Sequence, residues 1–122
     1  MNIPQDDLIK FWTWCGFTQY PQGRKNFHYE QTFKVMDWIY PKGHYGMGYL
    51  PQLELTEIFT YAIPKLQENG YNLQLDSRGN KFHAIIFNSN EKRMGLGIAD
   101  NPTEALYKAI MEVINANNTK GL

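Results

Sequence analysis

The chain has 122 residues, of which 43% are hydrophobic and 20% are charged, with twelve basic and twelve acidic side chains. This length suits one domain with a single core and is short for two ordinary domains. The composition is typical of a globular protein and excludes the disordered, collagen-like and coiled-coil classes. A protein that binds nucleic acid through its overall charge has a basic excess, so the balanced charge leaves only a local patch for such a role.

The cysteine count and the first residues bear on the cell compartment. Cys15 is the single cysteine, which excludes an internal disulfide framework of the secreted kind. Asp6 and Asp7 lie where a signal peptide needs basic residues, and no apolar run approaches the roughly 20 residues that span a bilayer. The sequence therefore predicts a cytoplasmic protein without membrane association.

The first half of the chain predicts a helix followed by a β-hairpin. A helix begins at Asp6, where Leu8, Trp12 and Cys15 recur at helical spacing, and it ends at Gly16. Residues 18–27 contain Pro, Gly and two basic residues and predict an exposed loop. The β-forming residues 33–50, with a turn at 41–44, predict the hairpin, which Pro51 ends.

A second helix is predicted after Pro51, with its N-cap at Glu54 or Thr56. Pro64 falls inside the pattern, where it removes one backbone hydrogen bond, so a kink or a break before a last turn at Asn69-Gly70 is expected. The apolar stripe of this helix consists of Leu55, Ile58, Phe59, Ala62, Ile63 and Leu66.

Residues 71–75, 81–89 and 93–100 predict a three-stranded meander, with a first turn at 76–80. Both faces of the middle segment are apolar, which is typical of a central strand. Gly95 and Gly97 share one face of the third strand and indicate that another element packs closely there.

A well-capped helix is predicted to follow the meander. Asn101 is its N-cap, Pro102 its first residue, and Glu104 completes a capping box. Its buried stripe is predicted to consist of Ala105, Leu106, Ala109, Ile110, Val113 and Ile114.

The order helix, hairpin, helix, meander and helix predicts an α+β fold, with an antiparallel sheet and its helices on one side, rather than a doubly wound parallel sheet. We expect a single domain over residues 1–122. Within it, 1–50 would hold the first helix and hairpin, 51–117 the helix, three strands and last helix, and 118–122 a frayed tail.

The helix–three strands–helix order of residues 55–117 matches the topology of the double-stranded RNA-binding domain. In that family a basic cluster at the start of the last helix binds phosphates. Here the corresponding segment, 100–104, carries two acids, Asp100 and Glu104, which repel phosphate. Topology alone is weak evidence of function, so the charges argue against this mode of RNA binding.

Aromatic and basic residues interleave around the predicted hairpin tip, and such a mixture can stack on and pair with a macromolecule. The alternative is that the aromatic side chains line the core. We predict a binding surface, for a protein partner, formed by Trp38, Tyr40, Lys42, His44 and Tyr45.

Two other kinds of ligand remain open. Four basic residues in the meander turns, Arg78, Lys81, Lys92 and Arg93, would give salt-dependent, non-specific nucleic-acid binding. A pocket in the sandwich would instead sequester a small molecule or nucleotide, and would appear as ligand-dependent thermal stabilisation.

The sequence predicts neither an enzyme nor a metal or cofactor site. His28, His44 and His83 match no zinc spacing, which requires ligand pairs a few residues apart. Cys15 lies on the apolar face of its helix, where a thiol behaves as a small hydrophobe. No nucleophile elbow, complete dinucleotide loop or paired carboxylates are present, so no catalytic residue is predicted.

Several segments together resemble a group of small phage and prophage proteins that carry the phage ABA sandwich domain. These segments are WCGF at 14–17, LP at 50–51, YAIPKL at 61–66 and GLGIADNPTEALYKAIMEVI at 95–114. The resemblance implies an α-β-α sandwich, a phage or prophage origin in a bacterial host cell, and a tolerated kink at Pro64. It implies no established activity and no catalytic residues.

These observations lead to one functional expectation. We expect a non-enzymatic phage or prophage accessory protein that binds another macromolecule, in the first place a protein. Self-association through sheet or helix faces is left open.

Overall fold

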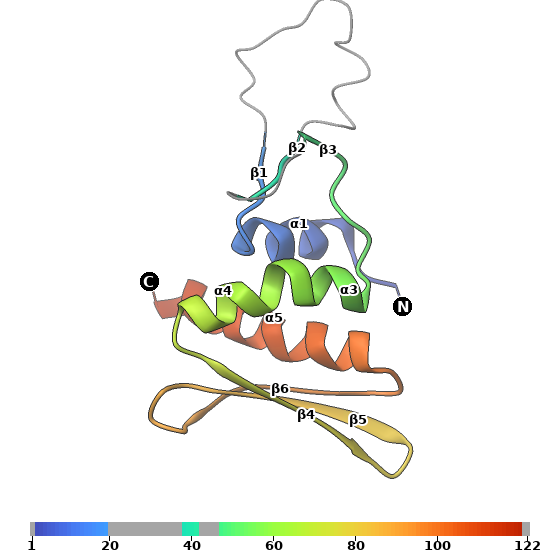
Figure 1. The fold of residues 1–122 in the computed structure, drawn as a ribbon, viewed down its shortest axis with the longest axis vertical. Coiled ribbons are helices and arrows are strands. Elements are labelled where there is room, and N and C mark those ends of the chain that lie inside the picture. The colour runs from blue at the N-terminus through green and yellow to red at the C-terminus, as the bar shows by residue number, and fades with distance from the viewer. Residues whose placement is uncertain (1, 20–37, 42–46, 121–122) are drawn as a thin grey trace, which may run out of the picture. The chain divides into compact units, whose positions relative to one another are not determined.

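The structure, a computed structural model, describes residues 2–19, 38–41 and 47–120 (Figure 1). The chain divides into two compact units, Asn2–Gln52 and Leu53–Leu122.

Helix α1 (Gln5–Trp14) in the first unit is the helix predicted from the sequence. Phe11 and Trp12 are fully buried on it. The helix ends at Trp14, and Gly16 just beyond its C-cap has a φ of 111°, in the left-handed region that residues with a Cβ rarely adopt. Glycine at this position therefore explains the end of the helix.

A small antiparallel sheet follows α1, in the order β1-β2-β3. The pairing of β2 (Trp38–Ile39) with β3 (Met47–Gly48) confirms a hairpin in this region. β1 (Thr18–Gln19) pairs with β2, so the predicted loop over 18–27 is wrong for its first two residues. Their backbone groups gain partners on a strand far along the chain, which local patterns in the sequence do not reveal.

The second unit begins with one continuous helix in three parts, α3 (Leu55–Glu57), η1 (Ile58–Ala62) and α4 (Ile63–Glu68). The middle part, η1, is a π-helical turn, closed by a hydrogen bond from the Ile63 N–H to the Ile58 carbonyl. Pro64 explains it, because proline has no N–H for the carbonyl four residues back and its ring clashes with that carbonyl. Of the kink or break predicted at Pro64, the break is therefore wrong, because a wider turn just before the proline lets the helix continue to Glu68.

Three antiparallel strands follow in the order β4-β5-β6, namely β4 (Asn72–Arg78), β5 (Lys81–Phe87) and β6 (Arg93–Ala99). The meander and the central place of β5 are confirmed. The predicted turn at 76–80 is too long, because Arg78 already pairs with Lys81. Gly79, with φ of 63°, allows a two-residue turn of the kind that matches the twist of the strands.

Helix α5 (Pro102–Lys120) covers one face of this sheet and runs beyond the predicted boundary at residue 117. The Asn101 side-chain oxygen accepts a hydrogen bond from the Glu104 N–H at 2.8 Å, which confirms the predicted cap. A Cβ built on Gly97 would lie 1.9 Å from the Ala105 carbonyl oxygen, and one on Gly95 would lie 2.3 Å from that of Ala109. The close approach predicted from the two glycines is therefore confirmed, with α5 as the neighbour.

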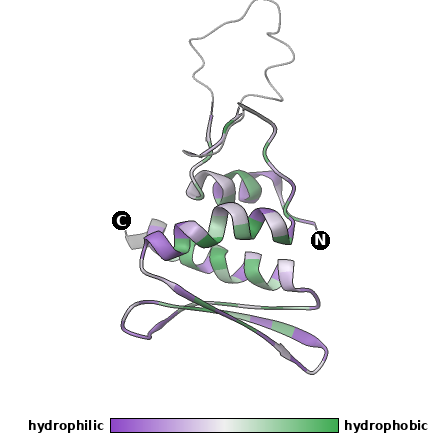
Figure 2. Ribbon diagram, viewed as in Figure 1, coloured by the Kyte–Doolittle hydropathy of each residue, from purple (hydrophilic) through white to green (hydrophobic). Residues whose placement is uncertain are grey.

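The sheet, α5 and the α3–η1–α4 helix form successive layers, with α5 in the middle (Figure 1). Hydrophobic residues are concentrated in α5 and η1 (Figure 2). The two antiparallel sheets and the helices together confirm the predicted α+β class. The fully buried residues of this unit include Ile58, Ala62, Ala84, Ile86, Leu106, Ile110 and Val113.

Candidate functional site

The face of the β4–β5–β6 sheet opposite α5, here called the outer face, carries a cluster of apolar side chains. Strand alternation and the cross-strand pairs Ile85–Leu96 and Ile86–Gly95 place Leu96 on this face and Gly95 beneath α5. None of the described helices of this unit lies against the outer face (Figure 1). We call the four residues Ile85, Phe87, Leu96 and Ile98 the apolar patch.

The apolar patch is accessible to a partner. Ile98 is 43% exposed, and the other three residues are half-buried. Their apolar surface is contributed by two adjacent strands, so it is continuous rather than scattered. Contiguous exposed apolar surface on a folded protein commonly marks an interaction site.

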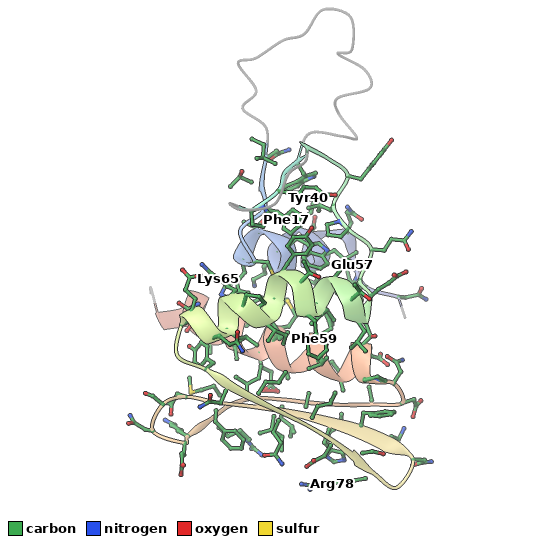
Figure 3. All side chains as sticks on the ribbon, in the orientation of Figure 1. Phe17, Tyr40, Glu57, Phe59, Lys65 and Arg78 are labelled. Atoms are coloured by element: carbon green, nitrogen blue, oxygen red, sulfur yellow. The ribbon has the colours of Figure 1, made fainter. Side chains whose placement is uncertain are left out.

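Polar side chains of β4 border the apolar patch along one side. Asp76 accepts hydrogen bonds from the Gln74 amide at 3.0 Å and from the Arg78 guanidinium at 3.2 Å. Figure 3 shows Arg78 pointing away from the helices, on the outer side of the sheet. His83 lies between Asp76 and Ile98 in the register, where the polar border meets the apolar patch.

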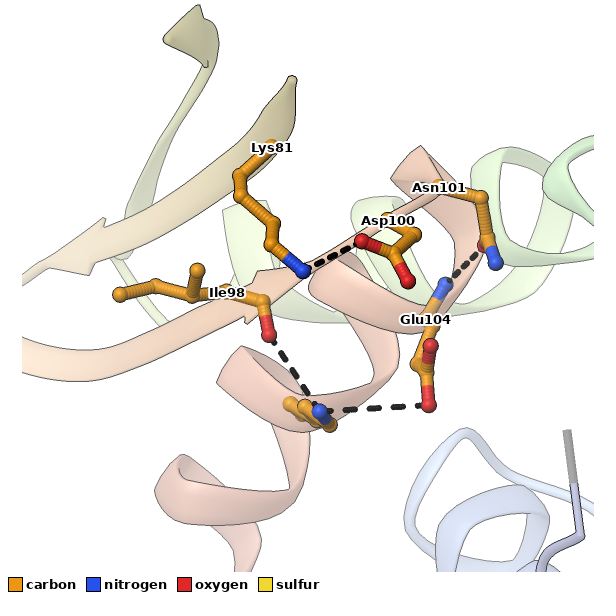
Figure 4. Close-up of polar contacts among 6 residues, drawn as sticks. Lys81, Ile98, Asp100, Asn101 and Glu104 are labelled. Carbon is orange, nitrogen blue, oxygen red and sulfur yellow. Dashed lines mark hydrogen bonds and ion pairs between the residues drawn. The ribbon is translucent and has the colours of Figure 1, made fainter. Parts of the chain in front are cut away.

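An ion pair closes the end of the outer face next to the start of α5. Lys81 donates to the Asp100 carboxylate, and both side chains are largely exposed (Figure 4). The hydrogen bond from Lys81 and then its positive charge lower the pKa of Asp100 below its ordinary value. The carboxylate of Asp100, which was predicted to repel phosphate, is thus paired with the Lys81 ammonium of β5.

Two side chains of α5 bind backbone groups of β6 on the edge of that strand that faces away from β5. The Lys108 ammonium donates to the Ile98 carbonyl at 3.3 Å and lies 3.9 Å from the Glu104 carboxylate (Figure 4). One turn later, the Glu112 carboxylate accepts a hydrogen bond from the Leu96 N–H at 3.2 Å. Both contacts occupy backbone groups that a further strand would need.

The predicted aromatic hairpin surface is described only in part. Trp38 and Tyr40 are half-buried. The Tyr40 ring lies edge-on to Phe17 with centroids 4.9 Å apart, and its hydroxyl donates to the Tyr49 carbonyl at 2.8 Å (Figure 3). Tyr40 therefore helps to hold its own unit together. Lys42, His44 and Tyr45 lie outside the described residues, so the binding role of this surface stays a prediction.

The four basic residues of the alternative nucleic-acid patch lie at the two ends of the meander. Arg78 and Lys81 flank the β4–β5 turn, whereas Lys92 and Arg93 lie at the β5–β6 turn. The intervening strand β5 separates these turns by roughly 20 Å. The structure brings the four residues together only as two pairs, and Arg78 and Lys81 each already contact a carboxylate.

Among the residues that the structure describes, no group of three or more His, Cys, Asp and Glu could hold a metal ion. Cys15 is buried, as its place on the apolar face of α1 predicted. No described helix is both long and apolar enough to cross a membrane.

Comparisons of the chain with protein-family models, with curated proteins and with solved structures find no match.

The apolar patch was not predicted as a site from the sequence. Its signal was present in β6, where Leu96 and Ile98 alternate with Gly95 and Gly97. A helix can pack closely on the face of a strand that carries glycines, so the large side chains of β6 lie on the opposite face. The position of the helix therefore determines whether Leu96 and Ile98 form an exposed patch or part of the core.

Proposed function

We propose that this chain is a non-enzymatic accessory protein that binds another protein through the apolar patch on the outer face. The observation that carries this proposal is that none of the described helices of the second unit covers the four apolar side chains on these two adjacent strands. An apolar centre with a polar border is the usual composition of a protein-binding surface. The border here is formed by Gln74, Asp76 and Arg78 on one side and by Lys81 and Asp100 at one end.

The charges of this surface favour a protein over a nucleic acid as the ligand. A phosphate backbone is bound by basic side chains whose charge is available to it. Arg78 and Lys81 instead neutralise the Asp76 and Asp100 carboxylates. The apolar patch next to these ion pairs offers apolar surface, which a folded or extended polypeptide can cover.

The phage part of the proposal rests on the sequence resemblance. The segments at 14–17, 50–51, 61–66 and 95–114 resemble the phage ABA sandwich family. We accordingly propose that the protein acts in the cytoplasm of a bacterial host cell, in the course of a phage or prophage programme.

The test compares two exposed apolar residues of equal character. Ile98→Lys places a charge in the apolar patch, whereas Leu55→Lys places the same charge on α3, away from the outer face; the two side chains are 43% and 37% exposed. Wild type and both variants are immobilised, and proteins captured from bacterial host lysate are quantified by mass spectrometry. Circular dichroism and thermal melting check that both variants fold.

The expected result is a set of proteins captured by wild type and by Leu55→Lys but lost with Ile98→Lys. A charge at the centre of an interface should weaken binding by about 30-fold or more, since such central positions contribute about 2 kcal/mol. Equal capture by Ile98→Lys and wild type would contradict the assignment of the surface. Retention on heparin that depends on Arg78 and Lys81 would favour nucleic-acid binding instead.

A further inference from the structure

The two edge strands of the β4–β5–β6 sheet are treated differently by the rest of the fold. Lys108 and Glu112 of α5 occupy the outward carbonyl of Ile98 and the outward N–H of Leu96, so β6 cannot accept another strand there. The register between β5 and β6 is also interrupted after Ile86. Capping groups and irregular pairing are the usual means by which proteins protect a sheet edge.

Among the described residues, none gives strand β4 these protections. It pairs with β5 in unbroken register over all seven of its residues, and five of the seven are exposed. It contains neither Pro nor Lys. The side-chain hydrogen bonds of Gln74 and Arg78 go to Asp76 on the same strand rather than to its backbone edge. An edge of this kind is suited to pair with a further strand.

The contacts on β6 also establish which residues of β4 direct their backbone outward. Because Leu96 and Ile98 direct theirs away from β5, the bonded pairs between β5 and β6 are the alternate ones, such as Ala84 with Gly97. The intervening β5 residues then bond to β4, including Ile85 to Gln74. The outward backbone groups of β4 consequently belong to Leu73, Leu75 and Ser77.

We propose that β4 pairs antiparallel with β4 of a second copy of this chain, about a twofold axis at Leu75, to form a continuous six-stranded sheet. In this register Leu75 lies opposite Leu75 of the second copy, and Leu73 lies opposite Ser77 of the second copy. All of these positions direct their backbone outward, so the pairing forms about six hydrogen bonds. No other twofold register on β4 aligns as many outward groups.

The side chains of β4 are complementary to themselves in the same register. On the outer face, the Gln74 amide lies opposite Asp76 of the second copy, and Asn72 lies opposite Arg78 of the second copy, so no like charges stand directly opposite. On the face toward α5, Leu75 is 38% exposed, since α5 lies over β5 and β6. Two such leucines facing each other would bury this surface, which contributes to association.

The proposal is tested by the oligomeric state of the full chain, measured by sedimentation over a concentration series. Wild type is expected to dimerise reversibly. Leu75→Lys puts like charges opposite each other at the axis and should weaken the dimer at least about tenfold. Leu75→Pro removes only an outward N–H and should have the same effect without breaking the pairing of β4 with β5. If Leu75→Pro fails to fold, Leu75→Lys decides the matter alone.

Crosslinking tests the register independently. Leu75→Cys places two thiols across the axis, within the Cα separation that a disulfide spans, and should form a covalent dimer on mild oxidation. Ser77→Cys is the matched control, because its two copies lie opposite Leu73 rather than each other. A monomeric wild type, a dimer unaffected by Leu75→Lys, or equal crosslinking of both cysteine variants would each overturn the proposal. A dimer lost with Ile98→Lys but kept with Leu75→Lys would assign self-association to the outer face instead.

This inference is separate from the proposed function. Leu75 variants act on self-association, whereas Ile98→Lys acts on the capture of a different protein. Either result can therefore fail while the other holds.

Discussion

On strand β6, the face of the β4–β5–β6 sheet that is buried is the less hydrophobic of the two. On β6, the face with Gly95 and Gly97 is buried beneath α5, whereas the face with Leu96 and Ile98 is left outside. The glycines allow the backbones of β6 and α5 to approach more closely than any larger residue would permit. Side-chain volume, and not apolar character alone, therefore determines which face of β6 the helix covers.

Gly97→Val would disrupt this arrangement most strongly. The added Cβ would meet the Ala105 carbonyl oxygen and lie 2.8 Å from the Ala109 nitrogen, both of which are backbone atoms that cannot move aside alone. We expect a loss of about 3 kcal/mol or more in the free energy of unfolding, from urea denaturation. Ile98→Val on the outer face of the same strand should change it by less than about 1 kcal/mol. Similar losses for the two variants would show that the faces are not distinguished by packing.

Adjacent isoleucines on β5 give a finer comparison of the two faces. Ile86 is fully buried and Ile85 is half-buried on the outer face. Ile86→Ala should cost about 3 kcal/mol because it leaves a cavity, whereas Ile85→Ala should cost about 1 kcal/mol, since it removes only part of a buried surface. The same urea experiment measures both. A larger loss for Ile85→Ala would mean that the outer face is covered in solution.

The smallest effect is expected for the ion pair at the end of the outer face. Lys81 lowers the pKa of Asp100 in the folded protein below its ordinary value of 3.8. The pair therefore stabilises the fold above that value, and its contribution is lost as the pH falls through the lowered pKa. Lys81→Gln should return the pKa of Asp100 toward 3.8, as measured by NMR titration of the carboxyl carbon. An unchanged pKa in this variant would mean that another group holds the carboxylate.

Much of the fold follows from local patterns in the sequence. Helical spacing predicted α1 and α5, and the apolar residues on both faces of β5 predicted it as the central strand. The cap at Asn101 and the close approach at Gly95 were also predicted, because each depends on a few neighbouring residues with one dominant conformational preference. Such features need no knowledge of the rest of the chain.

Features that depend on distant partners were not predicted. β1 exists because it pairs with a strand about twenty residues later, and Asp76 extends β4 because it pairs with His83 rather than forming a turn. The apolar patch was not predicted because its exposure also depends on a distant element, the helix α5. Both faces of β5 are apolar, and only the position of α5 over the glycines of β6 decides which one is exposed.

The π-helical turn η1 affects how the helix would respond to the deletion of one residue. A π-helical turn holds one residue more than an α-helical turn while closing the same circuit of the helix. Losing one residue within 58–62 would therefore leave Leu66 on the side of the helix shared with Ile58, whereas a deletion elsewhere in the helix would rotate the later residues by about 100°. Once the extra residue is gone, however, the ring of Pro64 meets the carbonyl of the preceding turn. A chain that loses the extra residue of η1 would therefore fold well only if Pro64 were also replaced by a residue with a backbone N–H.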